Sequence, residues 1–176
     1  MTEWLGWYFT DETECLQYGD GRKIKVGETH TVECIPMLCE IGLHASPTVL
    51  DALGYASGPI LYRVSLNGKI VHGDDKSVAT ERTYMARIDA EKILREFARK
   101  CALSVINLWD CPDIVLEYLE TGDQTKRAAA RATAWTAAWT AAGDAAGDAA
   151  GDAAWDAQRD QFARLVNELF GEEAGR

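Results

Sequence analysis

Four side chains of the types that bind zinc lie within fifteen residues of one another. They are two imidazoles and two thiols: His30, Cys34, Cys39 and His44. A structural zinc site needs four such ligands on a tetrahedron and usually draws them from tight pairs such as C-x₂-C. The intervals here contain three, four and four residues, so no tight pair is present. The sequence therefore predicts no metal, with both thiols as small core residues and His44 hydrogen-bonded beneath the helix that follows it.

A row of carboxylates occupies the C-terminal third of the chain. A four-residue unit repeats between Ala134 and Asp160, and alanine fills most of the other positions. The carboxylate slot holds Asp144, Asp148, Asp152, Asp156 and Asp160, and the slot before it holds Trp135, Trp139, Gly143, Gly147, Gly151 and Trp155. On a helix these carboxylates would stand roughly 6 Å apart, whereas duplex DNA carries a charge about every 1.7 Å. The row is thus too sparse to favour mimicry of DNA.

The element that carries this row is expected to be a helix. A period of four that is rich in alanine and free of proline favours helix from about Gln124 to Phe170. Unbroken, it would span roughly 70 Å, which exceeds the diameter of a compact chain of this length. It therefore either projects or folds into a hairpin at the glycines. Those glycines would allow close approach by a second helix, from this chain's own N-terminal domain or from a second copy.

Composition excludes several classes of function. The chain has 176 residues, a net charge of −10 and five cysteines. The negative charge argues against direct binding to nucleic acid and favours a basic protein surface as partner. The sequence has no run of eighteen apolar residues that would predict a membrane span, and Met1 to Thr10 do not show the basic-then-apolar pattern of a leader. We therefore expect a cytoplasmic protein with reduced thiols.

A change in composition near Gly122 predicts two parts, residues 1–122 and 123–176. The first part has short alternating apolar runs such as Leu5 to Phe9 and Ile60 to Leu66, which are typical of strands. The expected fold class is α+β: a small, mostly antiparallel sheet with flanking helices, plus a long Ala-rich C-terminal helix or helical hairpin.

Local signals predict the boundaries of several elements. Ser46-Pro47 is a helix-start signal, with Ser as N-cap. Asn67-Gly68 predicts a type I′ turn joining two strands. Asp89 is expected to cap a helix that continues to Trp109, and a helix from Asp113 to Leu119 is expected to end at Gly122. Two arginines in the segment before Asp89, Arg82 and Arg87, would either enter a pocket or lie on the surface.

The N-terminal motifs resemble a family of phage and actinobacterial proteins without an assigned chemistry. The resemblance is carried by Cys39-Glu40-Ile41-Gly42-Leu43-His44-Ala45-Ser46, by Leu50 to Ala56, by Leu61-Tyr62-Arg63-Val64, and by Asp74-Asp75-Lys76 with Ala79-Thr80-Glu81-Arg82. Members of that family likewise end in alanine-rich tetrads. The resemblance implies a viral or prophage accessory protein, and by context an anti-defence role of the anti-CRISPR kind.

A looser resemblance points to an enzyme. The order of Gly42 to Ser46, a helix with Tyr55 and the strand from Ile60 resembles ADP-ribosyltransferase folds, where such elements frame an NAD pocket. That resemblance implies His44, Tyr55 and Glu81 as catalytic candidates and NAD or another nucleotide as cofactor. A typical motif around the catalytic Glu is absent.

Two functional hypotheses follow. The first is non-catalytic binding of a basic host protein or a second copy, with no cofactor, through the acidic Trp/Gly-bearing helix. Its partner-binding residues would be Trp135, Trp139, Gly143, Asp144, Gly147, Asp148, Gly151, Asp152, Trp155 and Asp156. The alternative is a nucleotide-binding domain of the transferase type, which is either active or sequesters a nucleotide signal.

Overall fold

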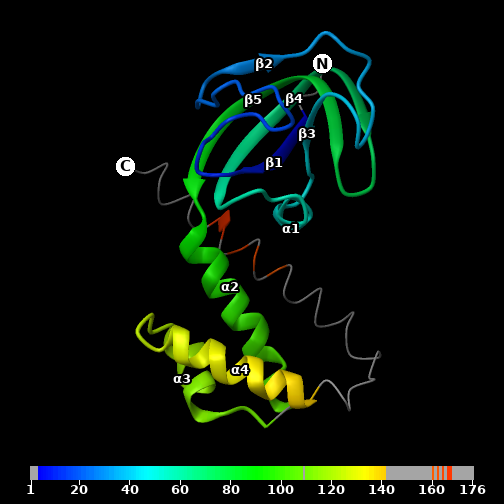
Figure 1. Cartoon of the computed structure of the whole chain (residues 1–176). Coiled ribbons are helices and arrows are strands. Elements are labelled where there is room, and N and C mark those ends of the chain that lie inside the picture. The colour runs from blue at the N-terminus through cyan, green and yellow to red at the C-terminus, as the bar shows by residue number, and fades with distance from the viewer. Residues whose placement is uncertain are drawn as a thin grey trace. The chain divides into compact units, whose positions relative to one another are not determined.

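The structure is a computed structural model, and it describes residues 4–108, 110–141, 160, 162, 164, 166 and 167. The chain divides into two compact units, which we describe separately. The first combines Met1–Lys92 with Phe162–Arg176, and the second is Ile93–Gln161. The described parts contain a mostly antiparallel sheet and several helices (Figure 1). This confirms the α+β fold class.

A five-stranded antiparallel sheet forms the centre of the first unit. Its strands are β1 (Trp4–Thr10), β2 (Thr29–Thr31), β3 (Leu43–Ala45), β4 (Ile60–His72) and β5 (Ser77–Asp89). The spatial order is β1-β4-β5-β2, and β3 also pairs with β5. β5 therefore has β4 on one side and both short strands on the other.

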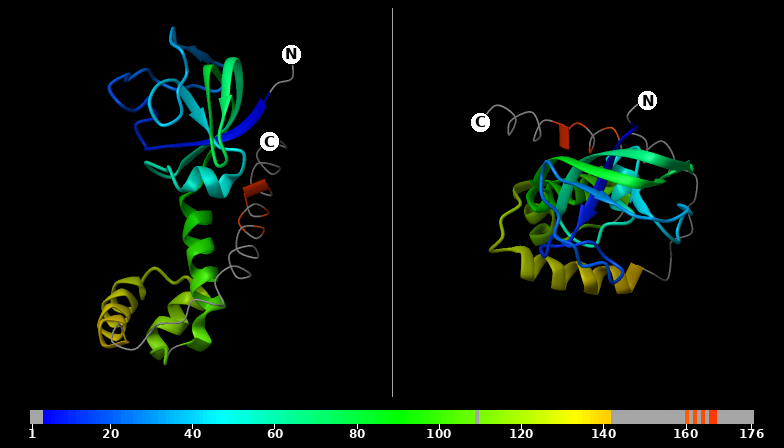
Figure 2. Two further views of the ribbon diagram at one scale, coloured as in Figure 1. Left: turned by 90° about the vertical axis from the view of Figure 1, so that its right-hand side faces the viewer. Right: turned by 90° about the horizontal axis from the view of Figure 1, so that it is seen from above.

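The β4–β5 hairpin departs from the sequence prediction. Asn67 lies inside β4 and pairs with Glu81, and the chain reverses only after His72, which pairs with Ser77. The predicted turn at Asn67-Gly68 is therefore wrong. The register shifts between Asn67 and Ile70, and Gly68 has φ +75°. A β-bulge and a tight turn both favour a glycine in the left-handed conformation. The dipeptide Asn67-Gly68 is therefore compatible with either one. Both views of Figure 2 show the hairpin curved rather than flat.

The curvature brings the end of β3 back to β1. Trp7 N–H donates to the Ser46 carbonyl at 2.8 Å, and Ser46 N–H donates to the Trp7 carbonyl at 2.9 Å. The concave face of the sheet encloses an apolar core that includes Leu43, Ala45, Ile60, Tyr62, Val64, Leu66, Ala79 and Tyr84. Phe162 and Val166, which are four residues apart and fully buried, also belong to this unit.

Helix α1 (Val49–Leu53) follows β3 but begins later than predicted. Its N-cap is Thr48, whose hydroxyl accepts a hydrogen bond from Asp51 N–H at 3.1 Å. Ser46 was the predicted cap, but its backbone is engaged by Trp7 instead. Tertiary strand pairing has displaced the local signal by two residues.

The second unit is helical. α2 (Glu91–Ser104) starts at the boundary, where Asp89 accepts a hydrogen bond from Glu91 N–H at 3.0 Å, as predicted. It ends five residues before the expected Trp109 and is followed by a 3₁₀ turn, η1 (Ile106–Leu108). α3 (Asp113–Thr121) ends at Gly122 in the left-handed conformation, which confirms that prediction.

The tail is described only at its start. α4 (Arg127–Ala141) confirms helix in the first tetrads, whereas the expected continuation toward Phe170 lies largely outside the described residues. The predicted boundary near Gly122 falls inside the second unit. None of the helices in the described ranges is long and apolar enough to cross a membrane.

Candidate functional site

A pocket of about 720 Å³ lies in the first unit, between β1, the loop before β3, α1 and the β4–β5 turn. We call it the Arg82 pocket. Its chemistry-bearing lining residues include Tyr8, Asp20, Cys39, Glu40, His44, Tyr55, Lys76 and Arg82. Its volume falls within the range of small-molecule sites, roughly 300–1,000 Å³.

Arg82 is the most unusual of these residues. It comes from β5, and its residue surface is only 2% exposed. Its guanidinium donates from Nε and Nη2 to the Tyr84 hydroxyl, at 3.1 and 2.9 Å, and from Nη1 to the His44 carbonyl at 2.5 Å. Three of the five guanidinium N–H groups are thereby used. In the described part of the chain, the other two have no acceptor.

No carboxylate in the described ranges forms an ion pair with Arg82. Its charge rests instead on aromatic faces, because the guanidinium carbon lies 3.7 Å from the centre of the Tyr8 ring and 5.1 Å from that of Tyr84. Cation–π contacts are worth about 2 kcal/mol when desolvated, whereas burying an unpaired charge costs several kcal/mol. An anion in the pocket would supply the missing counter-charge.

A buried histidine supports this cluster from β2. His30 pairs with Arg82 in the sheet register, and its Nδ1 lies 3.0 Å from the Tyr84 hydroxyl. Burial, followed by the charges of Arg22 and Arg82, lowers the His30 pKa. The neutral ring therefore orients Tyr84, which in turn holds Arg82.

His44, a predicted catalytic residue, lines the pocket, but loop backbone engages its ring. Its Nε2 accepts a hydrogen bond from Cys39 N–H at 3.2 Å, and a backbone hydrogen bond with Gly42 acts on the same ring. Burial, then the charges of Lys76 and Arg82, lowers its pKa. His44 thus holds the loop before β3. The prediction that it hydrogen-bonds beneath the helix after it is wrong.

Tyr55 also lines the pocket and is half exposed. Its hydroxyl donates to an Asp75 carboxylate oxygen, and Lys76 Nζ lies 4.0 Å from the centre of its ring. These contacts connect the end of α1 to the turn between β4 and β5. They place the Lys76 ammonium on the pocket lining.

Glu81, the third predicted catalytic residue, is elsewhere. It pairs with Thr31 of β2 and Asn67 of β4, beside the Gly68 bulge, and it does not line the Arg82 pocket. Alternation along β5 explains this, because adjacent residues of a strand point to opposite faces and Glu81 directly precedes Arg82. The structure brings His44 and Tyr55 together but leaves Glu81 out.

Sequence reasoning left the role of Arg82 open and missed Tyr8 and Lys76. Arg87, the other arginine of that segment, forms an ion pair with Glu14 at 2.9 Å and is 38% exposed at its side chain. The cue for Arg82 was its position within a strand, but which face of that strand is buried depends on how the strands pair. Without the register, neither arginine could be preferred.

The four side chains of zinc-binding type, His30, Cys34, Cys39 and His44, do not form a metal site in the structure. Within the described ranges, no three His, Cys, Asp or Glu side chains are placed to hold a metal ion. His30 contacts Tyr84, and His44 contacts the Cys39 backbone. All five cysteines are free, as expected, but Cys39 is exposed, so its placement in the core was wrong.

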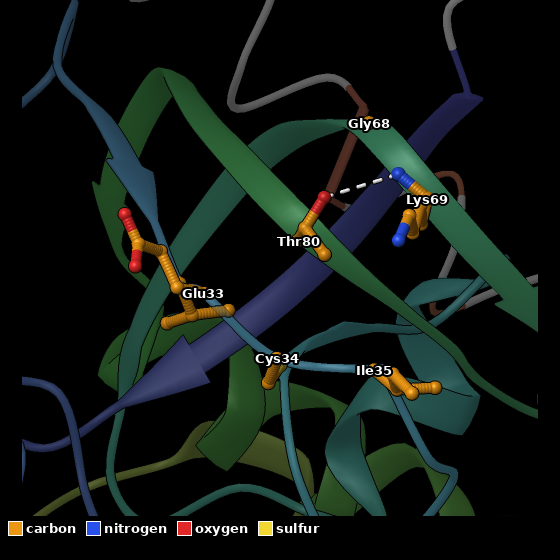
Figure 3. Close-up of a pocket in the computed structure, with 7 residues that line it drawn as sticks. Glu33, Cys34, Ile35, Gly68, Lys69 and Thr80 are labelled. Carbon is orange, nitrogen blue, oxygen red and sulfur yellow. Dashed lines mark hydrogen bonds between the residues drawn. The ribbon is translucent and has the colours of Figure 1, made fainter.

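A second, shallower hollow of about 610 Å³ lies where the segment after β2 faces the bulge (Figure 3). Glu33, Cys34 and Ile35 line one side, and Gly68, Lys69 and Thr80 line the other. The Thr80 hydroxyl accepts a hydrogen bond from Lys69 N–H at 3.0 Å. None of the residues that line this hollow carries a buried charge. The Arg82 pocket is therefore the stronger candidate for a ligand-binding site.

The structure does not describe the side chains of the predicted partner surface. Trp135 and Trp139 lie on α4, but the structure does not describe their side chains. Gly143, Asp144, Gly147, Asp148, Gly151, Asp152, Trp155 and Asp156 lie outside the described residues.

Residues 8–96 match a sequence family described as "Domain of unknown function (DUF7666)", and the match covers just over half of the chain. The chain belongs to the DUF7666 family. The DUF7666 domain includes Tyr8, His44, Tyr55, Lys76 and Arg82, whereas the tetrad tail lies beyond it. No curated protein and no solved structure matches the chain.

Proposed function

We propose that the DUF7666 domain binds a small anionic ligand of the nucleotide class, NAD or another nucleotide, in the Arg82 pocket. One observation carries the proposal: Arg82 is almost completely buried, lines a pocket, and has no carboxylate partner in the described part of the chain. A phosphate or carboxylate group accepts hydrogen bonds from the free edge of a guanidinium in the geometry that arginine favours.

The remaining lining residues suit the rest of a nucleotide. Lys76 supplies a second cation at the pocket. Tyr18 and Tyr55 add exposed aromatic surfaces on which a base could stack, and both line the pocket. Stacking on an aromatic side chain is worth about 1–3 kcal/mol per base. A phosphorylated ring compound therefore fits better than a simple inorganic ion.

Binding is better supported than turnover. Transfer from NAD would require an acidic residue in the pocket to stabilise the developing positive charge, and the candidate Glu81 does not line it. Two other carboxylates do, but Asp20 is paired with Arg22 and Glu40 is exposed on the loop before β3. Loop backbone engages the His44 ring, and Asp75 engages the Tyr55 hydroxyl. We therefore infer sequestration of a nucleotide.

The biological setting is an expectation from the phage and actinobacterial resemblance. A nucleotide-sequestering accessory protein in the host cytoplasm would act against defence systems that use nucleotide signals. The alternative role in that setting is the binding of a basic host protein or a second copy by the acidic tail. It rests on the tetrad pattern alone.

Isothermal titration calorimetry with NAD, ADP-ribose and cyclic mononucleotides tests the proposal. We expect one of these to bind wild-type protein, and Arg82→Gln to weaken binding by at least about tenfold, because a charge-assisted hydrogen bond is worth about 1.5–3 kcal/mol. Arg63→Gln is the matched control. Arg63 is partly buried and, like Arg82, stacks on an aromatic ring, that of Trp7 at 4.6 Å, but it does not line the pocket.

Thermal unfolding of each variant confirms that it is folded before titration. If no nucleotide gives heat with the wild-type protein, the proposed function is wrong. If binding occurs and survives Arg82→Gln unchanged, the ligand lies elsewhere and the pocket assignment fails.

A further inference from the structure

The lining of the Arg82 pocket carries charges of both signs. Besides the cations Lys76 and Arg82, it includes two carboxylates, Asp20 and Glu40. A site that only collected anions would gain nothing from carboxylates, because like charges repel each other. The lining therefore suits a ligand that carries hydrogen-bond donors as well as a negative charge.

Asp20 is a carboxylate held in a fixed position. Arg22 donates to Oδ1 from its Nε at 2.7 Å and from its backbone N–H at 3.2 Å, and it donates to Oδ2 from Nη2 at 2.7 Å. The side-chain hydrogen bonds from Arg22 lower the pKa of Asp20, which keeps the carboxylate ionised at neutral pH. An ionised carboxylate can accept about four hydrogen bonds. Oδ2 therefore retains a free acceptor position among the described residues.

The Asp20–Arg22 pair turns its carboxylate toward the pocket, because Asp20 lines the pocket and Arg22 does not. Glu40, the other carboxylate of the lining, is exposed and has no ion pair in the described part of the chain. A side chain that is already fixed loses less conformational entropy on binding than a free one. Asp20 is therefore the better-prepared acceptor of the two.

Strand pairing places Asp20 next to Arg82 but not at the same point. Arg22 Nη1 donates to the Thr31 carbonyl of β2 at 3.0 Å, and Thr31 pairs with Glu81, the residue before Arg82. The guanidinium of Arg82 reaches the His44 carbonyl of β3, and β3 pairs with an earlier part of β5 than β2 does. The carboxylate and the guanidinium would thus contact neighbouring groups of one ligand.

An exposed aromatic side chain lies on the same loop as Asp20. Leu16 is buried in the core, and its N–H donates to the Arg22 carbonyl at 2.8 Å, which closes the loop. Between them, Tyr18 is fully exposed, lines the pocket and has no hydrogen bond or ring contact within the described residues. By contrast, a lysine ammonium already lies 4.0 Å from the centre of the Tyr55 ring. Tyr18 therefore offers the free stacking surface.

We propose that Asp20 binds the ribose of the ligand, so that the pocket selects ribonucleotides over 2′-deoxyribonucleotides. This assignment rests on the proposed binding of a nucleotide. A ribose hydroxyl donates to Asp20, as it does to the acidic residue of dinucleotide-binding folds, while a phosphate binds Arg82 and the base stacks on Tyr18. Exposure rises in that order, from 2% for Arg82 through 28% for the Asp20 side chain to the fully exposed Tyr18. Phosphate, ribose and base follow one another in the same order in a nucleotide.

The test is calorimetric titration of the full-length protein with two matched pairs of ligands. One pair is cyclic AMP and 2′-deoxy-cyclic AMP, and the other is ADP-ribose and its analogue that lacks the adenosine 2′-hydroxyl. In the pair that binds, we expect the 2′-hydroxyl form to bind at least about tenfold more tightly, because the lost hydrogen bond is made to a charged group.

Asp20→Ala should remove this preference and bring the two dissociation constants to within about twofold of each other. A purely structural role of Asp20 would weaken both ligands equally and leave their ratio unchanged. Glu12→Ala is the matched control, because Glu12 is an exposed carboxylate that does not line the pocket, and it should keep the preference. Thermal unfolding confirms that each variant is folded.

Equal affinity of the wild-type protein for both members of a pair overturns the ribose assignment but leaves nucleotide binding intact. A preference that survives Asp20→Ala also overturns the assignment, as does a preference that Glu40→Ala removes and Asp20→Ala does not. If no nucleotide binds the wild-type protein, the proposed function and the ribose assignment are both wrong.

Discussion

The guanidinium carbon of Arg82 lies 3.7 Å from the centre of the Tyr8 ring, so a buried cation on β5 is stacked on an aromatic side chain from β1. These strands are not neighbours, because β4 lies between them. The curvature of the sheet makes the contact possible. It allows Arg82 to be buried although no carboxylate in the described part of the chain is paired with it.

Replacing Tyr8 tests this stacking. Tyr8→Leu keeps an apolar side chain but removes the ring face, and we expect it to lower the free energy of unfolding by about 1–2 kcal/mol. Tyr8→Phe keeps the face and should cost less than half as much. Urea denaturation measures both. Equal losses in the two variants would show that the ring does not stabilise Arg82.

The Tyr84 hydroxyl is expected to matter through Arg82. It accepts two hydrogen bonds from the guanidinium and contacts His30. Tyr84→Phe should lower the free energy of unfolding by about 1–3 kcal/mol, because it leaves buried donors without an acceptor. In the Arg82→Met background the same change should cost less. A double-mutant cycle with zero coupling would contradict this account.

Stability should fall on mild acidification because of two histidines. Burial lowers the pKa of both His30 and His44 below the ordinary value of 6.5. As pH falls below about 6.5, the unfolded chain therefore takes up protons before the folded one does. The free energy of unfolding then falls by up to about 1.4 kcal/mol per pH unit for each group, until pH drops below the folded pKa.

Urea denaturation between pH 7.5 and 5.0 measures this dependence. His30→Gln and His44→Gln should each flatten the slope, whatever they do to stability at pH 7.5. An unchanged slope in both variants would mean that other groups cause the acid sensitivity.

Replacing two glycines by alanine distinguishes the stability cost of backbone strain from the cost of steric overlap. Gly68 and Gly19 both have positive φ, but a Cβ at Gly68 would lie 2.1 Å from Thr80 Oγ1, whereas a Cβ at Gly19 would meet nothing within 4 Å. Gly19→Ala should cost about 1–2 kcal/mol, the penalty for a left-handed alanine. Gly68→Ala should cost clearly more, since overpacking adds to it. Thermal unfolding compares them, and equal costs would argue against a tight bulge.

The tail hypothesis makes its own prediction. Charge reversal to Lys at Asp144, Asp148 and Asp152 should abolish capture of a basic partner from host lysate. The control reverses three exposed carboxylates of the first unit, Glu12, Glu33 and Asp74, and so changes the net charge equally. Capture that survives reversal in the tail would exclude the acidic row as the contact.

Local signals were reliable where a few adjacent residues decide the outcome. The Leu5 to Phe9 pattern lies within β1, Asp89 accepts from Glu91 N–H at the start of α2, and Gly122 ends α3 in the left-handed conformation. Each depends on alternation or on a single capping residue, which the neighbouring sequence contains. The α+β class follows from the sum of such signals.

The same signals misled where strand pairing intervened. Asn67-Gly68 satisfies the requirements of a turn, but in the structure it forms a bulge within β4. Ser46 could cap a helix, but its backbone pairs with Trp7. In both cases the local preference was correct about backbone conformation and wrong about the element that uses it.

The sequence by itself determined the types of residue available, the strand and helix signals and the negative charge of the chain. Only the tertiary structure decided that Arg82 enters a pocket, that His44 and Tyr55 join it, and that Glu81 does not. The physical reason is register: side chains alternate along a strand, and the pairing of the strands decides which of the two faces is buried. The bulge at Gly68 likewise forms only through pairing with β5, where Asn67 is opposite Glu81 and Ile70 is opposite Ala79.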